Sequence, residues 1–148
     1  MIRKTTGFEP KSKNYKANVN DSFKKQSFLK FIGAKLVDVS PGRIEIEIYN
    51  DENLHQQEGF FHGGVTTTIA DVSMGYAALS LSGDYSEVLT TEFKVNLLKP
   101  AVGKKLIARS EVIKFGNLLK VCQSSVYCVS EKNEESLCAF VTGTMYVK

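Results

Sequence analysis

HQQEGFFHGGVTTTIADVSMGYAALS, residues 55–80, is the stretch that decides the fold. It opens with amides and aromatics around a glycine, passes through a His-Gly-Gly, and continues as an apolar run of mostly small residues. From His62 to Gly83 it carries one formal charge, Asp71, although 24% of the chain is charged. The pattern predicts a helix over residues 64–82 without the charged face of a surface helix, so we expect it to be buried nearly all round.

Two stripes run along the predicted helix when its residues are placed at about 100° intervals. The first is apolar and consists of Val65, Ile69, Val72, Tyr76 and Leu79. The second consists of Gly64, Thr68, Asp71, Gly75, Ala78 and Ser82. Every member of the second stripe except Asp71 is small, so a strand, a partner or a ligand could come close to it.

Asp71 is the unexpected residue, because a buried carboxylate without a countercharge is costly and its pKa rises through desolvation. It would be structural if it accepted hydrogen bonds from a backbone N–H or a hydroxyl, or lay at an exposed patch. The alternative is chemical. Gly63 and Gly64 lie where the helix should begin, and a first helical turn offers unpaired N–H groups and the positive end of the dipole. An oxyanion site and a carboxylate that activates water are the parts needed to hydrolyse an ester or thioester.

The second half of the chain predicts four long strands. They cover residues 86–98, 104–115, 118–130 and 135–147. The breaks between them carry turn residues, in Lys99–Gly103, Gly116–Asn117 and Glu131–Glu134. Short connections between long strands predict an antiparallel meander, whose apolar face must be covered. We therefore expect an α+β fold in which a strongly curved antiparallel sheet wraps the long central helix.

The first part of the chain predicts a basic leader, one helix and two strands. Residues 1–25 carry seven Lys or Arg against two acidic residues, and residues 1–20 are expected to form a flexible leader. Residues 21–33 predict a short amphipathic helix capped by Asp21 or Ser22 and ended by Gly33. Its expected apolar face is Phe28, Phe31 and Ile32. Two strands follow, at 34–39 and 43–49, and residues 21–148 are expected to form one domain.

The composition excludes several classes of protein. A formal net charge of +3 does not by itself indicate nucleic-acid binding. No continuously apolar stretch is long enough to span a membrane and the leader lacks a secretory apolar region, so a cytoplasmic location is expected. The three cysteines, Cys122, Cys128 and Cys138, are odd in number and lack the spacing of a metal site, which indicates buried thiols.

The motif in residues 55–78 resembles the helix-opening motif of the hotdog-fold acyl-CoA thioesterases, in particular the family related to the phenylacetate-pathway (PaaI-like) thioesterase. That pattern has an amide residue, a Gly, a His-Gly-Gly, and an Asp eight residues after the first of those glycines, as from Gly63 to Asp71. The likeness continues through VLTTEFKVNLLKPAVGKKLIA, residues 88–108. The resemblance implies a hotdog fold and hydrolysis of an acyl or aryl-acyl coenzyme A to the free acid and CoA.

Carried over residue by residue, the resemblance implies four catalytic positions. Asp71 would activate water or attack the thioester directly, and the Gly63 N–H would polarise the thioester carbonyl. Thr90 falls where relatives place a Ser or Thr that orients the water, although strand propensity alone also explains a threonine there. Gln56 falls where many relatives have Asn, a departure that leaves an amide donor on a longer side chain.

Five further residues are candidates for substrate binding, each with a structural alternative. His62 and Gly64 flank the oxyanion glycine, and His62 could serve only to brace the loop. Phe61 could line an acyl pocket or belong to the core or an interface. Lys114 and Lys120 flank the Gly116–Asn117 turn and could meet the phosphates of coenzyme A or remain solvated.

The resemblance also implies partners. Such enzymes place the site between two subunits, so a homodimer or a dimer of dimers is expected, with no metal and with coenzyme A present only as part of the substrate. No nucleic-acid or membrane partner is expected. The alternative function is a non-catalytic acyl-CoA-binding module, a sensor or a carrier.

Overall fold

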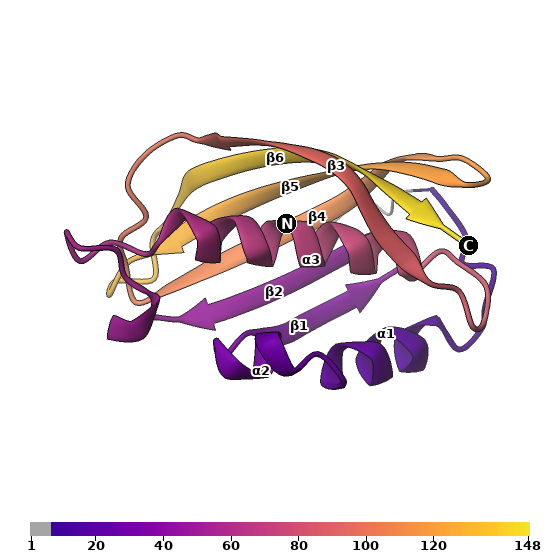
Figure 1. Cartoon of the computed structure of the whole chain (residues 1–148), viewed down its shortest axis with the longest axis horizontal. Helices are drawn as coiled ribbons and strands as arrows, with labels where there is room; N and C mark the ends of the chain where they lie inside the picture. Colours follow the sequence, from indigo (N-terminus) through magenta and orange to yellow (C-terminus); the bar gives the residue numbers. More distant parts are fainter. Residues whose placement is uncertain (1–6) are drawn as a thin grey trace.

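One long helix lies against a curved antiparallel sheet in this structure, a computed structural model that describes residues 7–148. Within these residues the strands are β1 (Lys35–Ser40), β2 (Arg43–Tyr49), β3 (Val88–Leu97), β4 (Lys105–Phe115), β5 (Leu119–Val129) and β6 (Glu135–Val147). The helices are α1 (Tyr15–Lys24), α2 (Ser27–Phe31) and α3 (Gly63–Leu79), with a 3-10 turn, η1, at Glu52–Leu54. The strand order is β1-β2-β4-β5-β6-β3, and the sheet wraps α3 (Figure 1). The predicted α+β architecture with a central helix is confirmed.

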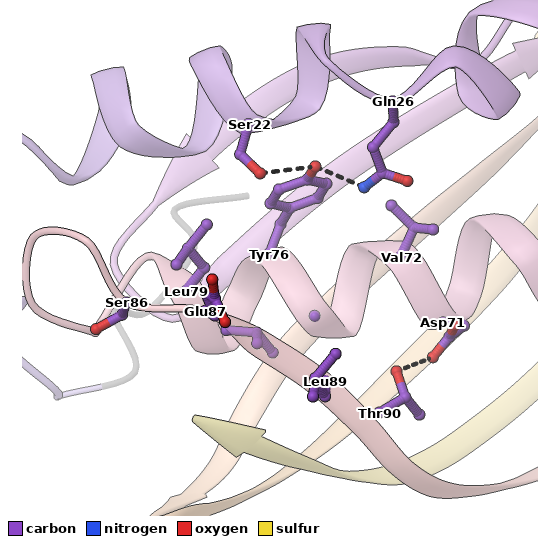
Figure 2. Close-up of a pocket in the computed structure, with 12 residues that line it drawn as sticks. Ser22, Gln26, Asp71, Val72, Tyr76, Leu79, Ser86, Glu87, Leu89 and Thr90 are labelled. Carbon is purple, nitrogen blue, oxygen red and sulfur yellow. Dashed lines mark hydrogen bonds between the residues drawn. The ribbon is translucent and has the colours of Figure 1, made fainter. Parts of the chain in front are cut away.

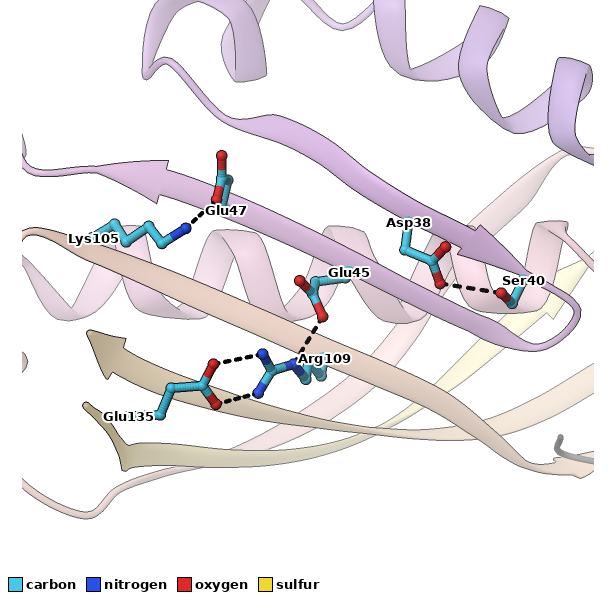
Figure 3. Close-up of polar contacts among 7 residues, drawn as sticks. All are labelled: Asp38, Ser40, Glu45, Glu47, Lys105, Arg109 and Glu135. Atoms are coloured by element: carbon cyan, nitrogen blue, oxygen red, sulfur yellow. Dashed lines mark hydrogen bonds and ion pairs between the residues drawn. The ribbon is translucent and has the colours of Figure 1, made fainter. Parts of the chain in front are cut away.

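Strand β2 shows how an alternating sequence makes the two faces of the sheet. The isoleucines at positions 44, 46 and 48 are all buried in the core. Glu45 and Glu47 point to the opposite face, where they meet basic side chains of the neighbouring strand (Figure 3). Arg109 Nε lies 2.8 Å from a Glu45 oxygen, Lys105 Nζ lies 2.6 Å from a Glu47 oxygen, and Arg109 also pairs with Glu135. The ion pairs therefore run across β2, β4 and β6 on the face away from α3.

The predicted four-strand meander is wrong in one strand. Strands β4, β5 and β6 follow one another as antiparallel neighbours, but β3 pairs with β6 and forms the edge of the sheet. The connection from β3 to β4 contains Pro100 and Gly103 and has the composition of a tight turn, yet it carries the chain across to β2. Turn residues fix a local change of direction and not which strand becomes the neighbour, so the sequence could not distinguish the two arrangements.

The N-terminal helix also differs from its predicted form. Two helices, α1 and α2, stand where one was expected, and α1 begins six residues before the predicted start at residue 21. Val19 of α1 is fully buried against the core. Residues 15–20 are therefore helical, and the domain boundary expected at residue 20 falls inside α1. The lysine-rich composition concealed a helix that needs only one deeply buried side chain to dock.

The apolar face predicted for this region was wrong for the two phenylalanines. Phe28 and Phe31 are exposed, Phe31 by 85%, whereas Leu29 is buried to 1% exposure and Ile32 is also buried. Gly33 ends the helix as predicted, with a φ of 75° that favours glycine. A five-residue helix gives too little periodicity to decide which side faces inward, so the bulkiest residues were taken for the core.

This difference can be measured as stability. We expect Leu29→Ala to cost about 2–5 kcal/mol of unfolding free energy, because it leaves a cavity in the core. Phe31→Ala should change the unfolding free energy by no more than about 0.5 kcal/mol. Denaturant unfolding of the two variants checks the ranking, and a larger loss for Phe31→Ala would restore the face predicted from the sequence.

Helix α3 is buried on the side that faces the sheet and open on the other. Ile69 and Met74 are fully buried. A Cβ built at Gly143 of β6 would lie 3.1 Å from the Met74 side chain, so this glycine permits the close approach of helix and sheet. Asp71 and Gly75, by contrast, are only half-buried. The expectation that α3 is buried nearly all round is thus wrong for this side of a single protomer, since none of residues 7–148 covers it fully.

None of the helices in residues 7–148 is long and apolar enough to cross a membrane.

Candidate active site

Asp71 and Thr90 meet on the open side of α3. The Thr90 hydroxyl donates a 2.8 Å hydrogen bond to Asp71 Oδ1 and lies 3.5 Å from the sulfur of Met145 (Figure 2). Asp71 comes from the middle of α3, and Thr90 comes from β3. These two of the predicted catalytic residues are therefore brought together, with one oxygen of the carboxylate held and the other directed at no partner in the described residues.

Burial raises the pKa of Asp71 above the ordinary value of an aspartic acid. The hydrogen bond from Thr90 opposes this effect, because it stabilises the charged form. No basic side chain within the described residues forms an ion pair with Asp71. A carboxylate with a raised pKa and one free oxygen is suited to accepting a proton near neutral pH.

A groove of about 520 Å³ opens beside Asp71. Its walls come from α3, from the first residues of β3 and from Ser22 and Gln26 at the end of α1 (Figure 2). Val72, Leu79 and Leu89 make much of the surface apolar. Farther along the groove the Tyr76 hydroxyl lies 2.6 Å from Gln26 Nε2 and 3.3 Å from Ser22 Oγ.

His62 caps the start of α3 and leaves one backbone donor free. Its Nδ1 accepts a 2.9 Å hydrogen bond from the N–H of Gly64. The Gly63 N–H, in the first position of the helix, has no acceptor in the described part of the chain. A Cβ at Gly64 would lie 2.9 Å from His62 Nδ1. His62 and Gly64 therefore satisfy one another, and the Gly63 N–H is the donor left for a ligand.

A second pocket lies around Gly63. Gln56, Phe61 and Gly63 line it together with residues of the β3–β4 connection. Gln56 Oε1 accepts from the Glu58 N–H, so its Nε2 is the end of the amide that remains free to donate. Phe61 is buried and packs edge-on against His55, with ring centroids 6.0 Å apart. The structure thus places Gln56, Phe61 and the free Gly63 N–H in one pocket.

The two halves of the predicted catalytic set are separated within one protomer. Gly63 and Asp71 are eight residues apart in one helix, which corresponds to about 12 Å along its axis, and they line different pockets. A single thioester carbonyl cannot contact both at that separation. Gly63 and Asp71 of one chain therefore do not face one another, and the expectation of a site between two subunits stays a prediction.

The two candidate phosphate-binding lysines lie away from both pockets. The β4–β5 turn is at the end of the molecule opposite Gly63 (Figure 1). Lys120 is only 1% exposed, donates a 2.6 Å hydrogen bond to the Asn117 carbonyl, and lies over the Phe115 ring. Burial lowers its pKa. Lys120 thus holds the turn from inside instead of flanking it in solvent, and Lys114 is exposed on β4.

The hydrogen-bonded cluster of Ser22, Gln26 and Tyr76 in the Asp71 groove was not predicted to belong to the site. Tyr76 was placed in the apolar stripe of α3, where its hydroxyl was the one signal of a polar role. Ser22 was considered only as a helix cap. Their contact spans about fifty positions of the chain, and no local pattern reports such a pairing.

No cluster of three or more His, Cys, Asp or Glu side chains suited to a metal ion occurs in residues 7–148. The three cysteines are free and buried, as predicted.

Comparison with known proteins places this chain in a family. The model of the thioesterase superfamily matches residues 58–133. The 1,4-dihydroxy-2-naphthoyl-CoA hydrolase of Listeria monocytogenes is 29% identical over 109 residues, which cover 72% of this chain and 85% of that protein.

Solved structures give the same family and fold. A thioesterase family protein from Silicibacter pomeroyi is 40% identical, with a TM-score of 0.88 over 90% of this chain and 97% of that one. The PaaI protein from the phenylacetic acid degradation operon of E. coli shares the fold, with a TM-score of 0.78 over 90% of this chain and 92% of its own, at 16% identity. The chain thus belongs to the thioesterase superfamily and is a thioester hydrolase with the hotdog fold.

Proposed function

We propose that the protein is an acyl-CoA thioesterase that releases the free acid and coenzyme A. The observation that carries the proposal is the pair of unsatisfied groups on α3: a free N–H at Gly63 and a half-buried carboxylate at Asp71 with a raised pKa. One suits an oxyanion and the other suits activation of water. Coenzyme A enters as part of the substrate, with no separate cofactor.

The working site is formed between two protomers, with Gly63 of one and Asp71 of its partner. The separation of about 12 Å between these residues within one helix is the reason, because it excludes a site built from one chain. If two α3 helices lie antiparallel and cross near residue 67, midway between Gly63 and Asp71, the first turn of each comes level with Asp71 of the other. The open side of α3 around Asp71 and Gly75, on which Asp71 is the one charged residue of the helix, is the surface available for that contact.

Strand β3 offers a way to form the dimer. It is the edge of the sheet, it pairs with β6 alone among the strands of residues 7–148, and most of its side chains are exposed. Leu89, Phe93 and Leu97 present apolar side chains there. A long edge strand with exposed apolar side chains is a template for pairing with another chain. Pairing of β3 with β3 of a second copy would join the two sheets and bring the two α3 helices together.

The reaction follows from these placements. The thioester carbonyl oxygen accepts from the Gly63 N–H at the positive end of the α3 dipole, and the Gln56 amide donates nearby. Asp71 of the partner takes a proton from a water molecule while the oxygen of that water bonds to the carbonyl carbon. Thr90 holds the carboxylate of Asp71 in position. The C–S bond then breaks, and the proton on Asp71 passes to the departing thiolate. Direct attack by Asp71 would instead expel the thiolate and form an anhydride, and water that then attacks the aspartyl carbon would leave labelled oxygen in Asp71 after a single turnover.

The proposal is tested by thiol release from a panel of short, long and aromatic acyl-CoAs, with the oligomeric state measured by sedimentation equilibrium. We expect hydrolysis and a dimer or a multiple of dimers. A folded protein that binds these thioesters and releases no thiol from any of them would contradict the proposal and indicate a binding module.

The Thr90 hydroxyl gives a pH-dependent test. Thr90→Val removes the hydrogen bond that stabilises the charged form of Asp71, so the pKa of Asp71 should rise further. We expect the acidic limb of the pH profile of kcat/KM to shift to higher pH, with activity recovering as Asp71 ionises. An unchanged limb would mean that the titrating group is not Asp71. Thr91→Val, a threonine on the neighbouring position of the same strand, is the control.

A further inference from the structure

We propose that Ser22, Tyr76 and Gln26 form a recognition site for the distal end of the acyl group, selecting thioesters that carry a hydroxyl there. The inference rests on the proposed thioesterase function of the same groove. It assigns a substrate class, acyl groups with a polar end, and the residues that select it.

The position of the three residues supports this role. Tyr76 lies five residues after Asp71 on α3, about 7.5 Å farther along the helix axis, and both line one groove. Its hydroxyl lies between Ser22, which is on α1, and Gln26, which is in the link between α1 and α2 (Figure 2). An acyl group with its carbonyl beside Asp71 and its tail along the groove would reach this cluster.

The hydrogen bonds within the cluster leave both a donor and an acceptor unused. The Tyr76 oxygen accepts from Gln26 Nε2, and Tyr76 and Ser22 share one further hydrogen bond. Two hydroxyl protons serve that single bond, so one O–H remains to donate. Gln26 Oε1 has no donor within residues 7–148. A free donor beside a free acceptor is the complement of a hydroxyl group, which both accepts and donates.

The surroundings make this pair selective. Tyr76 is only 4% exposed, and Val72, Leu79 and Leu89 supply apolar walls of the groove that holds the cluster and Asp71. A plain hydrocarbon tail would displace water from the cluster and leave its polar atoms unpaired, whereas a hydroxylated tail would replace those hydrogen bonds. The walls accept a ring or a chain equally, so the selection acts on the polar end and not on the shape of the tail.

Two matched pairs of thioesters test the inference in the full-length protein. They are hexanoyl-CoA with 6-hydroxyhexanoyl-CoA, and 3-phenylpropanoyl-CoA with its para-hydroxy derivative. In wild type we expect kcat/KM to favour the hydroxylated member of at least one pair by about ten-fold. Gln26→Leu and Tyr76→Phe should remove that preference by lowering kcat/KM for the hydroxylated member alone. Gln123→Leu, which removes an amide from the opposite face of the sheet, should keep it.

Two outcomes would overturn the inference: equal kcat/KM within both pairs in wild type, or a preference that survives in both cluster variants. Binding of the non-hydrolysable thioether analogues is measured in parallel by calorimetry. If no thioester is hydrolysed while the hydroxylated analogues still bind more tightly, the recognition site stands and the proposed hydrolysis fails. If the thioesters are hydrolysed without any preference for the hydroxylated members, the proposed hydrolysis stands and the recognition site fails.

Discussion

Asp71→Asn is expected to reduce turnover by roughly a hundred- to ten-thousand-fold, the range that a positioned proton acceptor contributes, while the protein stays folded. The amide has nearly the shape of the carboxylate and can still accept the hydrogen bond from Thr90. It cannot take a proton from water. Thiol release from the best thioester of the panel measures the loss, and Asp38→Asn, a carboxyl-to-amide change on β1, is the matched control.

The same variant should be at least as stable as wild type. Burial raises the pKa of Asp71 in the folded protein above that in the unfolded chain, so folding binds the proton more tightly. The stability contribution of Asp71 therefore falls as the pH rises from the unfolded pKa through the raised folded one. Asparagine removes the cost of burying the ionised carboxylate. We therefore expect the variant to have a melting temperature at neutral pH equal to or above that of wild type, and the difference between the two to be smaller at acidic pH. Activity above about a tenth of wild type would instead remove Asp71 from the proton-transfer role.

The architecture could be predicted from the sequence where a sequence pattern is compatible with only one structural arrangement. A helix with a single charge over some twenty residues needs a sheet to cover it. A strand in which Ile and Glu alternate places its isoleucines on the core face of the sheet and its glutamates on the opposite face. Asp71 could be singled out for the same reason, because no stability argument accounts for a lone carboxylate in such a helix. In each case the local sequence pattern and the environment in the folded protein favour the same structure, so the prediction made from the pattern agrees with the structure.

The errors arise where the decisive contact is distant in the chain. Pro100 and Gly103 indicate a turn, but they do not indicate that β3 pairs with β6. Leu29 instead of Phe31 is buried because of how α2 docks, which five residues cannot encode. The distance between Gly63 and Asp71 was available from helix geometry alone, since eight residues span about 12 Å. What the sequence concealed was that the two residues line separate pockets.

Gly63→Pro should lower turnover by about a hundred- to a thousand-fold, the usual effect of losing one oxyanion donor. Gly63 is the first residue of α3, where proline is favoured because its missing N–H has no helical partner. His62 already has the extended backbone, with φ −60° and ψ 137°, that the residue before a proline adopts. The variant thus removes the N–H and keeps the helix.

Gly63→Ala is the matched control, because it keeps the N–H and adds only a Cβ, 3.1 Å from the Leu97 side chain. Alanine at 63 should retain most of the turnover that proline loses. Equal losses in both variants would assign the effect to crowding against Leu97 and remove the oxyanion role from the Gly63 N–H.

Combining this variant with Asp71→Asn tests whether the site is shared between protomers. In a heterodimer of one Gly63→Pro chain and one Asp71→Asn chain, isolated through two affinity tags, each site takes its N–H from one chain and its carboxylate from the other. One of the two sites then has both defects and the other has neither, so about half of wild-type activity should return from two inactive parents. If Gly63 and Asp71 acted within one chain, every site in the heterodimer would be defective and no activity would return. Recovery can come only from a carbonyl held by one protomer and a water activated by the other.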